Sequence, residues 1–408
     1  MSIPRPSLYL NFAQAPGILD PRAVFTRAST GTTIDRVGLL RTVPASAPRW
    51  TSQPITGVPQ GVLVEGPRTN LALQSEAFGT TWTATSCTVT SNTAAAPDGA
   101  TTADTITVSG ASGSCNQGIA ITAGNAITLS VHLKRLASSL GRLRITDGTN
   151  AVAAWFNLAA GTVGTASAGG ATVVYAAHAM EALANGWYRC QLTVTTATST
   201  SFFIHVSAAA TDNVEPANGD NVYAWGAQAE APGGTSAASS YIATTTATVT
   251  RSGDSLVVPV SANWFNTAEG TLLVEWAGRT TGLGGQVFAA VNNGFNEIIY
   301  LTRPNATQLQ FQVGSGGSGQ VTSLKSYTMV DGAISRAAMA WKVNDFAWSL
   351  NGDVPGTDSS GIVPTGIARI GIGCGWGSPA GAQSFVPIRL AAYWPYRLSN
   401  AALQTISQ

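Results

Sequence analysis

The acids and histidines of this chain do not form a recognisable catalytic set. A glycosidase needs two carboxylates that face each other across a cleft. Glu269 and Glu275 stand six positions apart, and Glu275 has no acidic neighbour at two-residue spacing. The three histidines, His132, His178 and His205, lie in strand-like segments, and no G-x-S-x-G motif accompanies them. No glycine-rich phosphate loop lies between a strand and a helix. We therefore expect that the protein is not an enzyme.

The cysteines show no metal-binding spacing. Cys87, Cys115, Cys190 and Cys374 form no C-x-x-C pair, and no histidine lies at ligand spacing, so a zinc site is not expected. Cys87 and Cys115 fall in two nearby strand-like segments and could pair. Free buried thiols are the alternative, and we prefer it.

Two aspartates are candidates for a structural calcium site. Asp98 and Asp104 could join backbone carbonyls around Ca²⁺, because this ion takes hard oxygen ligands. The alternative is that Asp98 serves the turn Pro97-Asp98-Gly99, and we prefer that interpretation. No other cofactor is expected.

Two loops carry residue types that suit sugar binding. Trp376 lies in the glycine-rich stretch 373–381, and an exposed ring there can stack on the apolar face of a sugar. The alternative is a ring folded back over the edge of a sandwich. Asn292, Asn293 and Asn296 surround a phenylalanine, and their amides can bond sugar hydroxyls. Ordinary turn chemistry is the alternative here. The tryptophans in strand patterns are expected in the core.

The composition narrows the possible partners. Charged residues make up 10% of the 408 residues and the net charge is +1, against roughly 25% charged residues in an average domain. The chain thus lacks the basic surface that nucleic acid or an anionic membrane would attract. No apolar run is long enough to span a membrane, and the N-terminus does not read as a Sec signal. A surface of hydroxyls and amides suits sugars or neighbouring subunits.

Short alternating strands separated by turns predict an all-β protein with two antiparallel β-sandwiches. Residues 1–67 are rich in proline and read as an extended segment that attaches to or wraps over a partner or the following domain. A pair of N-terminal hairpins that belongs to that domain is the alternative. Residues 68–252 read as a jelly roll, and residues 253–408 as a second sandwich. A short helix should end the chain, capped by Ser399 or Asn400, with Ala402, Leu403 and Ile406 on one side.

The stretch 223–251 is expected to connect the two sandwiches. A strand at 222–226 closes the first sandwich, and a Gly/Ser/Ala-rich excursion and a Thr-rich crossing lead on to Arg251. We expect this stretch to fix the geometry between the sandwiches and not to bind a ligand.

Ordered motifs in the first two-thirds of the chain resemble a family of bacteriophage and prophage virion proteins, the tail or head-spike fibre proteins. The motifs lie at residues 23–32, 48–49, 61–71, 74–78, 82, 96–104, 223–230, 240–244 and 249–251. The middle of this family looks like a carbohydrate-binding-module jelly roll. The C-terminal part is similar to concanavalin-like or laminin-G-like sandwiches, through residues 264–266, 270–271, 349–352 and 396–399.

The resemblance implies a structural protein of the virion, assembled in the host cytoplasm and exposed on the particle surface. Its partners would be other virion proteins, sister chains in a homo-oligomer (a trimer, by analogy with fibres) and a host surface glycan. A decoration or adaptor protein without glycan binding is an alternative. A secreted lectin-like module is another, which the N-terminus disfavours.

Overall fold

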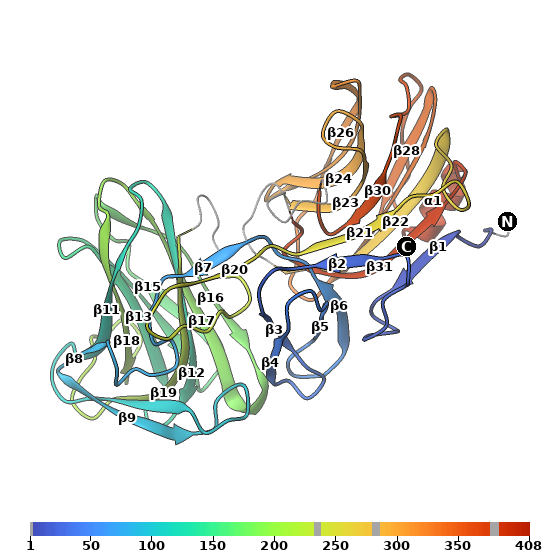
Figure 1. Ribbon diagram of the computed structural model, residues 1–408. Helices are drawn as coiled ribbons and strands as arrows, with labels where there is room; N and C mark the ends of the chain where they lie inside the picture. Colours follow the sequence, from blue (N-terminus) through green and yellow to red (C-terminus); the bar gives the residue numbers. More distant parts are fainter. Residues whose placement is uncertain (1–2, 232–237, 280–285, 376–382) are drawn as a thin grey trace.

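Two antiparallel β-sandwiches make up the computed structural model (Figure 1). The structure describes residues 3–231, 238–279, 286–375 and 383–408. The predicted all-β class with two antiparallel sandwiches is confirmed. In the described part of the chain, no helix has the length and apolar character needed to cross a membrane.

The first sandwich is the jelly roll, and its described strands form two six-stranded sheets. One sheet has the order β16 (Val173–Ala182), β17 (Trp187–Thr196), β12 (Ala126–Arg135), β19 (Asn221–Glu230), β10 (Ala103–Val108) and β9 (Cys87–Ala94). The other has the order β15 (Thr162–Ala166), β14 (Ala151–Asn157), β13 (Leu140–Thr146), β18 (Ser201–Ala209), β11 (Ser114–Ala120) and β8 (Thr83–Thr85). A 3₁₀ turn, η1 (Ala184–Gly186), joins β16 to β17.

Alternation along these strands builds the core between the two sheets. On β12, Ile127, Leu129, Val131 and Leu133 all point inward and are fully buried. Successive side chains of a strand face opposite sides, so every second residue can be apolar and shielded from water. The four cysteines are free and buried, and Cys87 and Cys115 both belong to this core.

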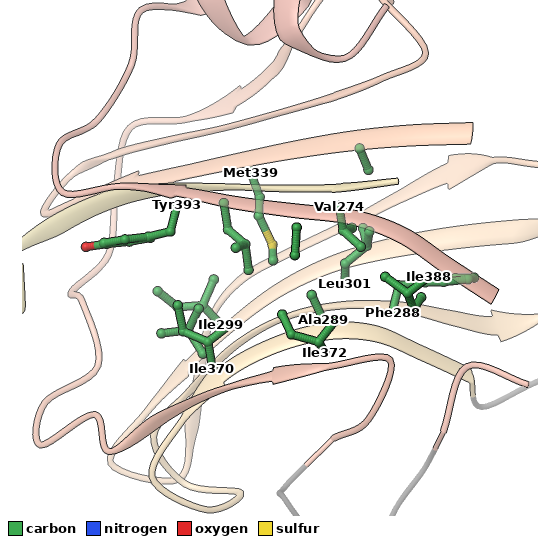
Figure 2. Packing of buried hydrophobic residues seen from close by; sticks show 14 of the residues in the cluster. Val274, Phe288, Ala289, Ile299, Leu301, Met339, Ile370, Ile372, Ile388 and Tyr393 are labelled. Carbon is green, nitrogen blue, oxygen red and sulfur yellow. The ribbon is translucent and has the colours of Figure 1, made fainter. Parts of the chain in front are cut away.

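The second sandwich, called here the C-terminal sandwich, has an eight-stranded and a seven-stranded sheet among the described residues. The larger sheet contains β29 (Gly356–Asp358), β28 (Asp345–Leu350), β27 (Ile334–Lys342), β22 (Glu269–Ala277), β31 (Pro387–Trp394), β6 (Pro59–Leu63) and β5 (Arg49–Ser52), with β1 (Leu8–Asn11) also paired to β31. The other contains β2 (Val24–Thr26), β21 (Ser255–Pro259), β30 (Arg369–Ile372), β23 (Gln286–Asn292), β24 (Ile298–Asn305), β25 (Gln308–Ser315) and β26 (Ser318–Ser326). Figure 2 shows apolar side chains packed between them, Phe288 among them. Trp276 stacks on Phe288 with ring centroids 4.3 Å apart.

Strands from the N-terminal segment complete both sheets of the C-terminal sandwich. Leu8 pairs with Tyr393, Leu63 with Pro387, and Val24 with Val257. The sequence pattern suggested that residues 253–408 form the second sandwich alone. The structure shows that strands from the N-terminal segment also belong to it. This arrangement depends on hydrogen bonds between strands that are far apart in the chain. No local sequence pattern indicates such bonds.

The jelly roll is thus an insertion between β6 and β21 of the C-terminal sandwich. The chain leaves the C-terminal sandwich through β7 (Arg68–Asn70) and returns to it through β20 (Val249–Arg251). These two strands pair with each other. A hairpin of β3 (Gly31–Ile34) and β4 (Leu40–Val43) lies nearby, and Leu40 packs with Trp187, Trp225 and Tyr241 on the outer side of the first jelly-roll sheet. Both crossings run close together in Figure 1.

The terminal helix α1 (Asn400–Ile406) forms where the sequence predicts it. Ser399 is its N-cap, and its side chain accepts a hydrogen bond from the backbone N–H of Ala402. Ala402 and Leu403 are buried, and they pack in a cluster that includes Trp394 on the outside of the larger sheet. Burial of this apolar face stabilises a helix that is too short to persist alone.

Candidate functional site

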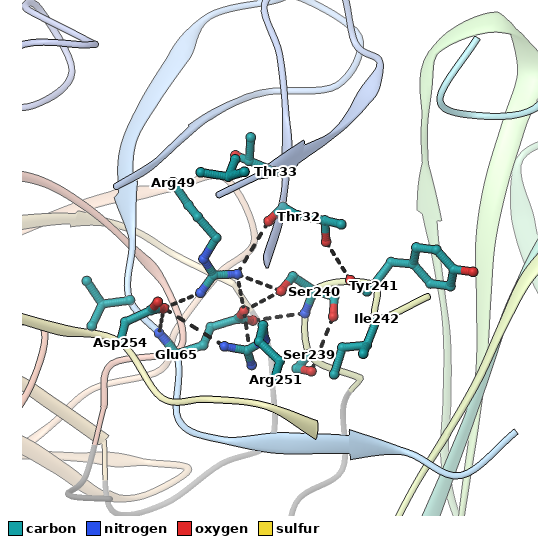
Figure 3. Close-up of polar contacts among 12 residues, drawn as sticks. Thr32, Thr33, Arg49, Glu65, Ser239, Ser240, Tyr241, Ile242, Arg251 and Asp254 are labelled. Atoms are coloured by element: carbon teal, nitrogen blue, oxygen red, sulfur yellow. Dashed lines mark hydrogen bonds and ion pairs between the residues drawn. The ribbon is translucent and has the colours of Figure 1, made fainter. Parts of the chain in front are cut away.

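A buried network of charged groups lies at the junction of the two sandwiches. Figure 3 shows Arg49 between Glu65 and Asp254. The Arg49 guanidinium lies 2.7 Å from Glu65 Oε2 and also pairs with Asp254. Arg27 pairs with Asp254 at 3.2 Å, and Arg251 with Glu65 at 3.4 Å. These five side chains, together with Ser240, are called here the junction network.

Burial makes this network sensitive to the loss of any partner. The side chains of Arg49 and Asp254 are fully buried, and that of Glu65 is 1% exposed. Burial alone would raise the pKa of Glu65, but the charges of Arg251, Arg49 and Arg279 lower it below its usual range. Glu65 is therefore ionised at neutral pH and depends on these arginines, because an unpaired buried charge is costly.

Ser240 connects the network to the segment that returns from the jelly roll. Its hydroxyl donates to Glu65 Oε2 at 2.6 Å, and its backbone N–H donates to Glu65 Oε1 at 3.0 Å. The next residue, Tyr241, is buried, and its carbonyl accepts a hydrogen bond from the Thr32 hydroxyl at 2.6 Å. The network thus fixes the position of Tyr241, whose ring reaches the jelly roll.

An open pocket of about 290 Å³ lies where the Tyr241 ring ends. The residues that line it are of polar types apart from two alanines, and it is called here the Glu76 pocket. The lining residues are Gln74, Glu76, Ala77, Asn92, Thr102, Ala243, Thr244 and Thr245. Its volume lies near the lower end of the range for small-ligand sites.

The first wall is the tight turn 74–77, which is held against the returning segment. The backbone N–H of Gln74 donates to the Thr245 carbonyl at 2.8 Å, and that of Ser75 donates to the Thr244 carbonyl at 3.2 Å. Gln74 has φ = 48°, in the left-handed region that non-glycine residues seldom adopt. Such a conformation persists where the surrounding contacts impose it.

The second wall is Asn92, which Asp104 positions. Asp104 Oδ1 accepts from the Asn92 backbone N–H at 3.0 Å, and Oδ2 accepts from the Phe78 backbone N–H at 2.8 Å. Asn92 also has a left-handed backbone, with φ = 57°. The one carboxylate of Asp104 therefore ties Asn92 to the end of the turn on the opposite wall.

Two buried aromatic side chains support the polar groups of the pocket. Trp225 Nε1 donates to the Thr102 hydroxyl at 3.1 Å, and the Tyr241 hydroxyl donates to Glu76 Oε1 at 3.0 Å. Ser75 Oγ lies 2.7 Å from the Tyr241 hydroxyl and therefore donates to it, because the Tyr241 proton goes to the carboxylate. Glu76 is held by an ordered chain of hydroxyls.

Glu76 is the only acid among the described residues that line the pocket. Burial, and then the negative charge of Asp98, raise the pKa of Glu76, while the Tyr241 hydroxyl partly offsets this. The described hydrogen bonds leave Glu76 Oε2 and the side-chain amides of Gln74 and Asn92 available to a ligand. Such a set can hold neighbouring hydroxyl groups, because carboxylates and amides accept or donate in pairs.

The structure separates the asparagines predicted for sugar binding. Asn292 is fully buried, and its side chain bonds the Ala290 carbonyl and the Gly294 backbone N–H within its own turn, both at 3.3 Å. It is therefore not accessible to a ligand, and turn chemistry accounts for it. Asn293 and Asn296 are exposed in the same loop. Trp376 lies outside the described residues.

The two predicted calcium ligands have local roles in the structure. Asp98 Oδ1 accepts from the Ala100 backbone N–H at 2.9 Å, which is the turn role preferred from the sequence. Both oxygens of the buried Asp104 accept from backbone amides. Within the described residues, no group of three or more His, Cys, Asp or Glu side chains could hold a metal ion. A calcium site here stays an untested prediction.

The residues of the Glu76 pocket are not recognisable from the amino-acid sequence. Gln74 and Glu76 belong to the motif at 74–78, but nothing in that motif shows which side chains share a cavity. Asn92 lies in a polar strand, and Thr244 joins the wall from a position far along the chain. The motif at 74–78 contains the one sequence feature that indicates the pocket, which is an acidic residue in a chain that has few charges.

Comparison with known proteins gives slight structural similarities. No protein-family model and no curated protein matches the chain. Among solved structures, CBM40 of the Ruminococcus gnavus IT-sialidase, bound to alpha2,3 sialyllactose, is 16% identical, with a TM-score of 0.30 over 35% of this chain and 84% of that one. Domain 4 of AbnA, a GH43 extracellular arabinanase from Geobacillus stearothermophilus in complex with arabinotriose, is 13% identical, with a TM-score of 0.28 over 42% and 82%. Domains LG4-5 of the mouse laminin alpha1 chain are 9% identical, with a TM-score of 0.24 over 83% and 91%.

Proposed function

We propose that this protein is a structural subunit of a phage particle, a tail fibre or head spike, that binds a host surface polysaccharide through the Glu76 pocket. The observation that carries the binding proposal is the pocket itself. It combines one carboxylate, two amides and threonine hydroxyls in a cavity of about 290 Å³. These groups match the hydroxyls of a sugar.

The single carboxylate of the pocket, Glu76, favours a ligand without negative charge. Glu76 would repel an anionic group at close range, and Asp98 adds a second negative charge nearby. We therefore propose a neutral saccharide. The fixed backbone of Gln74 and Asn92 supports this proposal, because a preformed site loses less conformational freedom on binding.

The virion role is supported by the ordered motifs at 61–71, 74–78 and 223–230, which resemble fibre and spike proteins. By analogy with fibres, the subunit would assemble as a trimer exposed on the particle surface. Weak individual sites suit such an assembly, because several linked copies raise the overall affinity. The insertion of the jelly roll through two paired strands would let it project from the C-terminal sandwich.

A glycan array tests the binding proposal. The wild-type protein should retain neutral oligosaccharides, and Asn92→Gly should lose most of that signal, because glycine keeps the left-handed backbone but removes the amide. Thr88→Ala, at an exposed position on the same strand β9, is the matched control and should bind as the wild type does. Equal signals from Asn92→Gly and the wild type would reject the pocket.

The virion role needs a separate test. Purified particles of the source phage should contain the chain, and labelled antibody should reach the jelly roll on intact particles. If the chain assembles into particles but neutral glycans do not bind, the protein is a decoration or adaptor subunit without this receptor function.

A further inference from the structure

The outer face of the second jelly-roll sheet carries a row of polar and aromatic side chains. Asn116 on β11 pairs with His205 on β18, and His205 pairs with Arg144 on β13. Cross-strand partners point to the same side of a sheet. Their neighbours along the strands, such as Leu143 and Ile204, are buried in the core. The row therefore faces outward.

Arg144 is a cation without an acidic partner on this face. None of the ion pairs among the described residues includes it. Its neighbour Arg142 is paired with Glu215 at 2.6 Å, and Asp212 is bonded to the hydroxyl and backbone N–H of Thr165. Glu215 is thus engaged by Arg142, and Arg144 leaves a local positive charge.

His205 does not neutralise Arg144. Its Nε2 lies 3.5 Å from the Arg144 guanidinium, which can only donate, so Nε2 is the accepting nitrogen. Nδ1 then carries the proton and donates to Ser114 Oγ at 3.0 Å. Burial, and then the charges of Arg144 and Arg142, lower the pKa of His205 to about 4. The imidazole is therefore neutral at pH 7 and orients the guanidinium.

An exposed aromatic ring lies beside this row. Phe203 is 45% exposed on the same outward face of β18, two residues from His205. It pairs with Gly118 of β11, and a β-carbon placed on Gly118 would be 3.7 Å from the ring. The missing side chain at Gly118 thus leaves the Phe203 ring lying over the sheet. An exposed ring of this kind can stack on a sugar.

We propose that the Arg144–Phe203 face binds an acidic saccharide, with Arg144 pairing to its oxyanion and Phe203 stacking on the adjacent sugar ring. The guanidinium fork matches a carboxylate or sulfate. In Figure 1, β11, β13 and β18 lie on the side of the jelly roll that is away from the C-terminal sandwich. This site is separate from the Glu76 pocket in residues and in ligand charge, and neither site requires the other.

Calorimetric titration with defined oligosaccharides tests the proposal. The probes are a galacturonate trimer, a sulfated galactose trimer and an uncharged galactose trimer. At this face the wild-type protein should prefer an acidic trimer over the uncharged one by at least about ten-fold, measured as the affinity for the acidic trimer that Arg144→Gln loses. That preference should weaken as salt rises, since salt screens charge pairs. Tighter binding of the galacturonate or of the sulfated trimer identifies which oxyanion source the face prefers.

Variants separate this site from the pocket and from general misfolding. Arg144→Gln should lose the preference for acidic trimers, and Phe203→Leu should weaken binding of each trimer that binds this face. Both should melt within a few degrees of the wild type. Arg135→Gln, which removes an exposed arginine from the other jelly-roll sheet, is the control and should leave acidic binding unchanged. An unchanged affinity for both acidic trimers in a folded Arg144→Gln protein would overturn the proposal.

Discussion

The hydroxyl of Tyr241 lies 3.0 Å from Oε1 of Glu76, and it joins the buried junction to the candidate sugar pocket. On the junction side, Ser240 is bonded to Glu65 and Arg49. On the pocket side, Tyr241 orients a carboxylate whose pKa is already raised by burial and by Asp98. The segment that fixes the two sandwiches therefore also positions the pocket.

Tyr241→Phe should weaken both the link between the junction and the pocket and the positioning of Glu76. Glu76 and Ser75 lose a hydrogen-bond partner, so we expect a loss of about 1–3 kcal/mol in the free energy of unfolding. The pKa of Glu76 should rise further, because the Tyr241 hydrogen bond lowers it. Urea unfolding and NMR titration of Glu76 measure the two effects. Tyr223→Phe, on a half-buried tyrosine of β19, is the control and should change neither.

Loss of Arg49 should destabilise the protein strongly. Arg49→Met leaves Glu65 and Asp254 with fewer counter-charges in a buried site, which costs about 3–5 kcal/mol. The control is Arg41→Met, which breaks an ion pair whose arginine side chain is 49% exposed and should cost less than about 1 kcal/mol. Urea denaturation compares the two variants. Similar small losses in both would show that the junction network adds little stability.

Stability should fall in mild acid because the pKa values of two histidines, the buried His132 and the half-buried His205, are lowered in the folded protein. Burial, and then the charge of Arg189, lower the pKa of His132 to about 3, and His205 has a pKa of about 4. The unfolded chain holds its histidine protons below about pH 6.5. Below about pH 6.5 the unfolded state therefore binds more protons than the folded state. The free energy of unfolding keeps its full value above about pH 6.5 and declines toward about pH 4.5.

Each of these histidines should contribute a slope of up to about 1.4 kcal/mol per pH unit in that window. Urea unfolding at pH 7.0, 6.0, 5.0 and 4.5 measures the slope. His205→Gln, at a half-buried position, should remove about half of it. A stability that stays constant from pH 7.0 to 4.5 would contradict the burial of neutral histidines.

The sequence predicted the strand content and the terminal helix because both depend on local patterns. Alternation marks β12 and β17, and Ser399 marks the start of α1. Strands β11 and β26 carry little local signal, since both are rich in small and polar residues. A strand that packs few large side chains has no alternating signature.

Long-range pairing explains why the composite architecture and the pocket could not be predicted. Leu8 pairs with Tyr393 in one sheet, and Tyr241 donates a hydrogen bond to Glu76 of the pocket. Both contacts connect residues that no local pattern relates. For Asn292 the residue type suited sugar binding, but the fold buries its side chain within its own turn. The side chain is therefore not accessible to a ligand.

Calorimetric titration of the wild type and Glu76→Gln with neutral fragments of the host polysaccharide tests the central proposal most directly. The substitution keeps the size of the side chain and an oxygen that can accept from Tyr241. We predict that affinity falls about ten-fold or more while the melting temperature stays within a few degrees, since charge-assisted hydrogen bonds are lost. Identical affinity in the two folded proteins would show that the Glu76 pocket does not bind the polysaccharide.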